Sequence, residues 1–241
     1  MHAIVLLSDF GSADAYVGVM KGVLHGLAPG APLIDLTHGV PPGNIRLAQL
    51  HLDAAWPYFP TGTIFLCVVD PGVGSSRRAV GVASRGRCFV GPDNGLLSAL
   101  PDARWRVIDT ASNPPRSNTF HGRDVFAPAA GRLATGAPFD ELGSEIDDPV
   151  RLTLPVPDGD RGEILAIDHF GNAISNLPGR GVGRLSVAGR TVPVLRTYAD
   201  VEPGEPLALT GSTGRLEVAV RNGNAAVAHG IVVGAPVEYL P

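Results

Sequence analysis

Strands and helices alternate along the first 135 residues, and this order constrains the fold more than any other feature of the sequence. Apolar runs typical of buried strands lie at residues 3–7, 32–36, 63–69, 79–82, 88–90 and 107–109. Helical spacing of apolar residues or helix-forming composition lies at residues 15–27, 44–55, 95–100 and 124–133. The alternation predicts an α/β domain with a largely parallel sheet. Ligands of such sheets bind beyond the carboxyl ends of strands, and Asp9 and Asp70 each follow a predicted strand.

The pattern changes near residue 150, where a polar, proline-containing stretch begins. Short apolar or alternating runs follow at residues 163–167, 184–187, 191–195, 206–210, 216–220 and 231–237. Glycine-rich turns separate them, and little helical patterning remains, which is typical of a small β-barrel or sandwich. We therefore predict an N-terminal α/β domain over residues 1–157 and a C-terminal β-domain over residues 158–241.

Composition excludes several classes of protein. The formal net charge of −4 offers no basic surface for nucleic acid or for an anionic membrane. No apolar run approaches the length of about 18 to 20 residues that a membrane span needs, and the apolar start is too short for a signal peptide. Cys67 and Cys88 lie in apolar runs and are expected to be buried thiols rather than a disulfide. We expect a cytoplasmic protein without nucleic-acid or membrane partners.

Five polar clusters fall in the predicted loops. They are residues 9–11, 70–72, 77–78, 120–124 and 168–172. Acids and histidines next to glycines are common in active sites, because glycine lets the backbone approach a ligand. Each cluster alone is a weak signal, since an acid after a strand often caps a turn or helix. Asp124, for example, is expected to cap its helix or to pair with Arg123.

Taken together, motifs spread over nearly the whole chain resemble one family. The motifs are SDFG at 8–11, MKG at 20–22, VVDPGVGSSRR at 68–78, VGPDNGLL at 90–97, TFHGRDVFAPAA at 119–130, IDHFGNAISNL at 167–177 and GNAA at 223–226. The chain resembles the S-adenosyl-L-methionine (SAM) hydrolases that form adenosine, also called SAM hydroxide adenosyltransferases, which are related to fluorinases and chlorinases. This resemblance implies an α/β domain followed by a β-barrel. It also implies a homotrimer with sites between neighbouring subunits, SAM as substrate, adenosine and L-methionine as products, and no cofactor or metal.

The resemblance implies a catalytic set of Asp70, Arg77 and His121, which would handle the attacking water. It also implies that Asp9 holds the ribose hydroxyls and that Asp168 faces the methionine ammonium. Phe170, Asn172 and Asn222 would lie beside adenine, Ser212 and Thr213 would hold the methionine carboxylate, and Phe10 completes the predicted substrate-binding set. Halogenating relatives carry an arginine at the position of Thr213, so this chain departs from them there.

These residue types suit the proposed ligand. One carboxylate, such as Asp9, accepts hydrogen bonds from both hydroxyls of a vicinal diol, and another, such as Asp168, pairs with an ammonium. An aromatic ring such as Phe170 stacks on adenine, while the amide of Asn172 can read its edge. The Ser212–Thr213 segment offers hydroxyl and N–H donors for a carboxylate.

The reaction is a displacement at the ribose C5′, and its difficulty lies in the nucleophile. The leaving sulfonium needs no acid, but bulk water has a pKa of about 15.7 and is a poor nucleophile. Either Asp70 or His121 could accept its proton, and Arg77 could stabilise hydroxide-like charge. Attack by an anion on a cation disperses charge, so a dry pocket favours the transition state, and no step needs a metal.

The nearest alternative is a halogenase of the same fold. Fluorinases and chlorinases carry an uncharged residue where this chain has Asp70, and they lack a histidine at the position of His121. A carboxylate beside the nucleophile repels a halide but accepts a proton from water. The sequence therefore favours a hydrolase.

Two alternatives come from other classes. A metal-dependent hydrolase would use Asp9, Asp70, His121 and Asp124, but these residues lack the local spacing of a known metal site. A non-catalytic module that binds adenosine or SAM would need the ribose and adenine residues alone. The presence of Asp70, Arg77 and His121 favours an enzyme over such a module.

Overall fold

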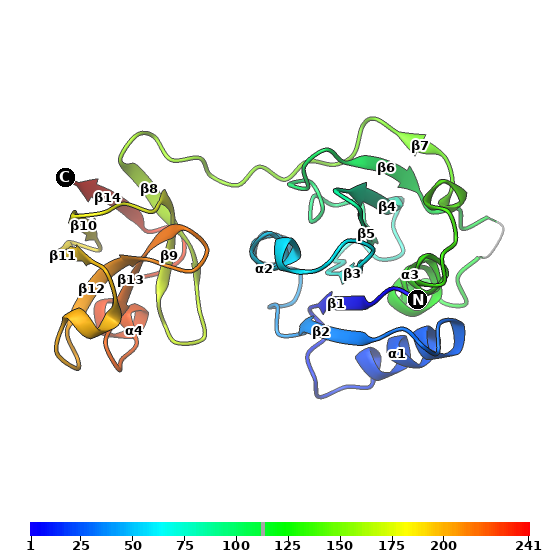
Figure 1. Ribbon diagram of the computed structural model, residues 1–241, viewed down its shortest axis with the longest axis horizontal. Coiled ribbons are helices and arrows are strands. Elements are labelled where there is room, and N and C mark those ends of the chain that lie inside the picture. The colour runs from blue at the N-terminus through cyan, green and yellow to red at the C-terminus, as the bar shows by residue number, and fades with distance from the viewer. Residues whose placement is uncertain (112–113) are drawn as a thin grey trace. The chain divides into compact units, whose positions relative to one another are not determined.

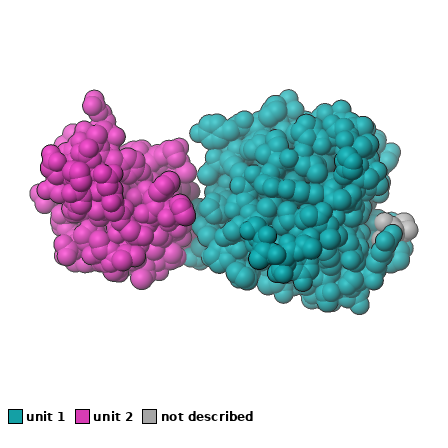
Figure 2. Space-filling model, turned by 90° about the horizontal axis from the view of Figure 1, so that it is seen from below, with its two compact units in different colours: residues 1–152 teal, residues 153–241 magenta. Residues whose placement is uncertain are grey.

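The computed structural model describes residues 1–111 and 114–241. It divides into two compact units, Met1–Leu152 and Thr153–Pro241, which Figure 2 shows in different colours. The domain division predicted after residue 157 stays a prediction. No helix in the described ranges is long and apolar enough to cross a membrane.

The first unit contains a seven-stranded mixed sheet, which confirms the α/β fold class. Its strands are β1 (Ile4–Ser8), β2 (Leu33–Thr37), β3 (Ile64–Val68), β4 (Ala79–Ser84), β5 (Arg87–Pro92), β6 (Arg104–Val107) and β7 (Glu145–Ile146), in the order β2-β1-β3-β5-β4-β6-β7. β2, β1, β3 and β5 pair in parallel, whereas β4, β6 and β7 add antiparallel pairs. The antiparallel half begins at a two-residue hairpin turn, Arg85–Gly86, in which both residues have positive φ.

Helices cover both faces of this sheet, which can be followed in Figure 1. They are α1 (Tyr16–Leu27), α2 (Ile45–Ala55) and α3 (Ala127–Ala134), with 3₁₀ turns at Trp56–Tyr58 and Phe139–Leu142 and a π-helical turn at Gly122–Phe126. Alternate residues of β1 point to opposite faces: Ile4 and Leu6 pack with α1 and α3, while Val5 and Leu7 pack with α2. A strand buried on both faces explains the continuous apolar run in the sequence.

Residues 95–100, predicted as a short helix, form consecutive turns instead. The Ser98 N–H donates to the Gly95 carbonyl (3.0 Å), and the Leu100 N–H donates to the Leu97 carbonyl (3.4 Å). Gly95 has a φ of +96°, which a helix cannot use, and Pro101 follows the segment. The run is too short to propagate a helix between these two residues.

The second unit is a closed seven-stranded barrel, as the resemblance implies. Its strands are β8 (Arg161–Ile167), β9 (Ala173–Pro178), β10 (Gly183–Val187), β11 (Arg190–Leu195), β12 (Pro206–Thr210), β13 (Arg215–Val220) and β14 (Pro236–Leu240), in the order β10-β11-β12-β13-β9-β8-β14. The 3₁₀ turn Tyr198–Asp200 and the helix α4 (Ala225–His229) lie between strands. Alternating side chains such as Leu185, Val192 and Val218 fill the interior.

The sequence missed two elements here and misplaced one. β9 follows the loop predicted at 168–172 and overlaps the motif at 167–177, which was used for the family resemblance and not predicted as a strand. α4 is a single short turn of helix after Asn224, which caps it. The last strand begins at Pro236 rather than at residue 231, because Gly234 adopts a positive φ (+84°) and forms a turn before it.

Candidate active site

Asp70, Arg77 and His121 form one hydrogen-bonded group beyond the carboxyl end of β3. Asp70 lies two residues after β3, Arg77 lies two residues before β4, and His121 directly precedes the π-helical turn. Arg77 Nε donates to Asp70 Oδ1 (2.9 Å), and Nη2 donates both to Asp70 Oδ2 and to His121 Nδ1 (2.8 Å). The side chains of Asp70 and Arg77 are only 6% and 10% exposed, so this ion pair is largely shielded from water.

The contact with Arg77 fixes the protonation of His121. A guanidinium has only donors, so Nδ1 of His121 must accept, and the ring proton lies on Nε2. Burial lowers the pKa of His121, and the positive charge of Arg77 lowers it further, against smaller opposing effects of Asp70 and Asp124. His121 is therefore neutral near pH 7 and presents an N–H away from Arg77.

Packing holds the Arg77 guanidinium in place. It lies over the Phe126 ring, with 5.1 Å between Cζ and the ring centroid, which is cation–π geometry. The loop before Arg77 also lies close to the backbone of Asn118. A Cβ on Gly74, whose φ is +79°, would lie 2.8 Å from the Asn118 carbonyl oxygen. Only glycine fits at residue 74, which explains part of the glycine-rich run after Asp70.

Asp9 lies directly after β1, at the same edge of the sheet. Its Oδ2 accepts a hydrogen bond from the Gly43 N–H (2.8 Å), and no described residue donates to Oδ1. Phe10 is half-buried and packs against Tyr16 and Phe120, with ring centroids 5.7 and 5.9 Å apart. Its ring is therefore part of an aromatic cluster with Tyr16 and Phe120, and its contact with substrate stays a prediction.

Two residues that the sequence analysis did not select support the Asp9 loop. The buried Ser8 Oγ lies 2.7 Å from His38 Nδ1 and accepts from the Phe10 N–H (3.3 Å). The Gly11 N–H donates to the His38 carbonyl (2.8 Å). His38 follows β2 just as Asp9 follows β1, so the parallel pairing of these strands was the signal that could have identified it.

In the second unit, Phe170, Asn172 and Asn222 line one surface hollow of about 810 Å³. Phe170 is 72% exposed, so its ring is open to a ligand. Asn172 is buried, and its Nδ2 donates to Asp168 Oδ2 (2.9 Å). Three residues predicted to lie beside adenine are thus neighbours, although they are up to 52 positions apart (222 − 170 = 52).

Asp168 organises the loop that carries these residues. Its Oδ1 accepts hydrogen bonds from the Phe170 N–H (2.9 Å) and the Asn172 N–H (2.8 Å). Both carboxylate oxygens therefore have local partners, and the predicted contact with an ammonium stays a prediction. Ser212 and Thr213 form the exposed turn between β12 and β13 and do not line the hollow.

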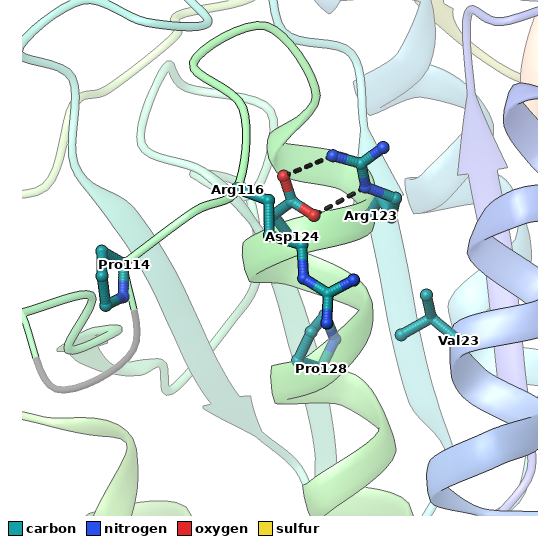
Figure 3. A pocket seen from close by; sticks show the side chains of 6 residues that line it. All are labelled: Val23, Pro114, Arg116, Arg123, Asp124 and Pro128. Carbon is teal, nitrogen blue, oxygen red and sulfur yellow. Dashed lines mark hydrogen bonds and ion pairs between the residues drawn. The ribbon is translucent and has the colours of Figure 1, made fainter.

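Asp124 forms the predicted ion pair with Arg123, which Figure 3 shows at the wall of a second hollow of about 180 Å³. Arg123 Nε donates to Oδ1 (2.6 Å) and Nη2 to Oδ2 (2.8 Å), while the Ser117 N–H also donates to Oδ2 (2.9 Å). The hydrogen bonds from Arg123 hold the pKa of Asp124 below its usual value. Asp70 is held by Arg77 in the same way, so both acids already form ion pairs with arginines. Among the described residues, no three His, Cys, Asp or Glu side chains come together as a metal site.

Comparison with known families identifies relatives over most of the chain. The family description "SAM hydroxide adenosyltransferase N-terminal domain" matches residues 4–143, and "SAM hydroxide adenosyltransferase C-terminal domain" matches residues 162–238. A Thermus thermophilus protein named (R)-S-adenosyl-L-methionine hydrolase is 45% identical over all of both chains. A Salinispora tropica protein of the same name is 42% identical, with 96% of this chain and 95% of that one covered.

More distant relatives and solved structures complete the comparison. A protein named fluorinase from Actinopolyspora mzabensis is 28% identical, with 90% of this chain and 89% of that one covered. The crystal structure of an uncharacterized conserved protein from Thermotoga maritima superposes with a TM-score of 0.91 at 35% identity, covering 99% of this chain and all of that one.

Proposed function

Because the chain belongs to the SAM hydroxide adenosyltransferase family, we propose that it hydrolyses S-adenosyl-L-methionine to adenosine and L-methionine. The observation that carries this proposal is the contact of Arg77 with both Asp70 and His121. The group lies at the carboxyl edge of the sheet, where ligands of α/β folds bind, and it combines an acid with a neutral imidazole. Such a group suits the activation of water.

In the proposed mechanism, Asp70 is the proton acceptor. His121 Nδ1 is occupied by Arg77, so its Nε2–H donates to the water and orients it toward the ribose C5′. Asp70 retains lone pairs beyond those used by Arg77 and takes the proton as the C5′–O bond forms and the C5′–S bond breaks. Arg77 stabilises the negative charge during attack, and methionine leaves as a neutral thioether with the electron pair of the broken C5′–S bond. No step requires a metal or a cofactor.

Substrate binding divides between the two units. The open Oδ1 of Asp9 suits the ribose hydroxyls, and the exposed ring of Phe170 suits adenine. Asn172 and Asn222 would read the base edge, while the Ser212–Thr213 turn would hold the methionine carboxylate and Asp168 the ammonium. We propose that a homotrimer brings the catalytic group of one subunit to the binding residues of its neighbour.

The relatives' name adds one point that the sequence analysis did not predict, namely the R configuration at the substrate. We propose that this chain shares that preference. We also propose a cytoplasmic location, because Cys67 and Cys88 are free thiols, of which Cys67 is buried.

Halogenation is the second candidate, favoured by the relationship to fluorinases. Asp70 argues against it, because a buried carboxylate at the nucleophile position repels halide. The test is incubation with SAM, with and without high chloride or fluoride, followed by chromatography. Equimolar adenosine and L-methionine support the hydrolase, whereas a 5′-halo-5′-deoxyadenosine as main product would refute it. No product at all would favour a non-catalytic binding module.

A further inference from the structure

A network of four polar side chains runs from the surface of the first unit to the loop that carries Asp9. Lys21 of α1 donates to Asp35 Oδ2 on β2 (2.6 Å), and His38 Nε2 lies 3.0 Å from Asp35 Oδ1. His38 Nδ1 lies 2.7 Å from the Oγ of Ser8, the last residue of β1. The parallel pairing of β1 with β2 brings these residues together. The proposed mechanism assigns no role to any of the four.

The contact with Asp35 fixes the tautomer of His38. Burial alone would raise the pKa of Asp35, but the hydrogen bonds from Lys21 and His38 outweigh this effect and hold the pKa below its ordinary value. The carboxylate is therefore charged near neutral pH and accepts hydrogen bonds at both oxygens, so Nε2 of His38 carries a proton. In the neutral ring Nδ1 is then an acceptor, and the Ser8 hydroxyl donates to it.

The order serine, histidine and aspartate is that of a hydrolytic triad, but Ser8 is not placed to act as a nucleophile. It is fully buried, and its Oγ also accepts a hydrogen bond from the Phe10 N–H (3.3 Å). The ring nitrogens of His38 are used in the reverse order as well, since a triad presents Nε2 to its serine and Nδ1 to its acid. A buried hydroxyl bonded in this way holds the backbone rather than attacking a substrate.

His38 holds the Asp9 loop at two points. The Ser8 Oγ, which His38 contacts, fixes the Phe10 N–H, and the His38 carbonyl accepts from the Gly11 N–H (2.8 Å). Asp9 lies between Ser8 and Phe10, so its backbone is fixed on both sides, while no described residue donates to its Oδ1. A hydrogen bond weakens steeply as its angle worsens, so an acceptor for two hydroxyls must be held at a set position.

We propose that His38 is a positioning residue for ribose recognition, an inference that rests on the proposed function. Held between Asp35 and Ser8, its ring keeps the Asp9 loop in the conformation that aims Oδ1 at the ribose hydroxyls. The His38 side chain is 11% exposed, whereas those of Asp35 and Lys21 are 45% and 33% exposed, so a surface ion pair supports a nearly buried ring. Loss of this support weakens the binding of ligands that carry a vicinal diol and spares ligands that lack it.

The test compares two nucleosides in His38→Leu, which removes both ring nitrogens. Adenosine carries the vicinal diol, and 2′,3′-dideoxyadenosine lacks it. We expect adenosine affinity, measured by calorimetry, to fall about 10-fold, a part of the full cost of a charged hydrogen bond, while affinity for the dideoxy analogue stays within about twofold. KM for SAM should rise by a similar factor with kcat within about threefold, because the diol is bound alike in the ground and transition states. His38→Asn, whose Oδ1 can replace Nδ1 as the acceptor for Ser8, should recover most of the adenosine affinity.

Three further variants sharpen this test. Asp35→Asn changes an exposed side chain and loosens the ring, so it should give the same selective loss at about threefold, even if His38→Leu fails to fold. Asp9→Ala combined with His38→Leu should lose no more adenosine affinity than Asp9→Ala alone, because the ring acts through Asp9. Asp140→Asn is the matched control, since it breaks another exposed ion pair of the same unit, with Arg106 (2.9 Å), and should leave both affinities unchanged.

The outcomes separate this role from the proposed function. Equal losses of affinity for the two nucleosides, no loss in any variant, or an additive double variant would overturn the role of His38. A wild type that prefers adenosine to its dideoxy analogue but releases none from SAM would overturn the proposed hydrolysis and leave this role standing. A wild type that binds both nucleosides equally would overturn the binding of the ribose by Asp9, and the role of His38 with it.

Discussion

Replacing Asp70 with asparagine separates the chemistry of the proposed site from its contribution to stability. The change preserves the size of the side chain but removes its charge and turns one oxygen into an amide nitrogen. That nitrogen would face a guanidinium N–H of Arg77, so one donor would meet another. Arg77 would remain buried with half of its pairing lost.

The size of both effects follows from burial and geometry. Breaking a buried ion pair costs about 3–5 kcal/mol of unfolding free energy. At roughly 2–4 °C per kcal/mol, this lowers the melting temperature by about 6–20 °C. Loss of a positioned proton acceptor lowers turnover by about 10²–10⁴, or roughly 3–5 kcal/mol in the transition state. Adenosine affinity should change little, because Asp70 acts on water rather than on the nucleoside.

The assay combines scanning calorimetry, adenosine titration and steady-state kinetics at a temperature where both proteins are folded. Asp93→Asn is the matched control, because it breaks a neighbouring buried pair: Arg78 Nε donates to Asp93 Oδ2 (2.8 Å), and the Asp93 side chain is 1% exposed. This control should lose stability yet keep near-normal kcat. If Asp70→Asn lost no more turnover per folded molecule than Asp93→Asn, Asp70 would not be the proton acceptor.

Three further predictions concern other residues. Burial and then the charge of Arg77 lower the pKa of His121, so activity that needs neutral His121 should persist as the pH falls to the usual histidine pKa of about 6.5 and decline only below it. A kcat–pH profile in which activity already declines above that pH would contradict this. Phe170→Ala should weaken adenosine binding by about 1–3 kcal/mol in calorimetry without lowering the melting temperature, since the ring is 72% exposed; an unchanged affinity would exclude stacking on adenine. Burial on β13 raises the pKa of Glu217 in the folded protein, so the stability it contributes is present when it is protonated and is lost as pH rises through that pKa. Glu217→Gln should therefore raise the melting temperature at pH 7.5, with a smaller gain near pH 4.5, and an equal gain at both would refute the assignment.

The α/β fold could be predicted because the pattern in the sequence has a direct physical cause. A strand covered by helices on both faces must be apolar throughout, and β1 and β3 show this. The antiparallel half of the sheet was harder to foresee, since a two-residue turn such as Arg85–Gly86 decides strand direction. The turns at residues 95–100 depend on the backbone of Gly95, whose φ no apolar pattern encodes.

The candidate site, like the fold, could be predicted from the sequence only in part. Pattern reasoning found the loops of Asp70, Arg77 and His121, but these residues are 7 and 44 positions apart, and the resemblance to a family was needed to join them. Ser8 and Glu217 went unnoticed for a different reason. Each lies within or at the end of a strand, where a polar residue is normally interpreted as facing solvent, and only the folded chain reveals that both are buried.

The central claim is that an activated water attacks the ribose C5′, and oxygen-18 labelling tests it most directly. The enzyme is incubated with SAM in H₂¹⁸O, and both products are analysed by mass spectrometry. The mechanism built on Asp70, Arg77 and His121 predicts one ¹⁸O atom in the 5′-hydroxyl of adenosine and none incorporated into L-methionine by the cleavage step. Unlabelled adenosine, or label in a product of cleavage on the methionine side of the sulfonium, would contradict it.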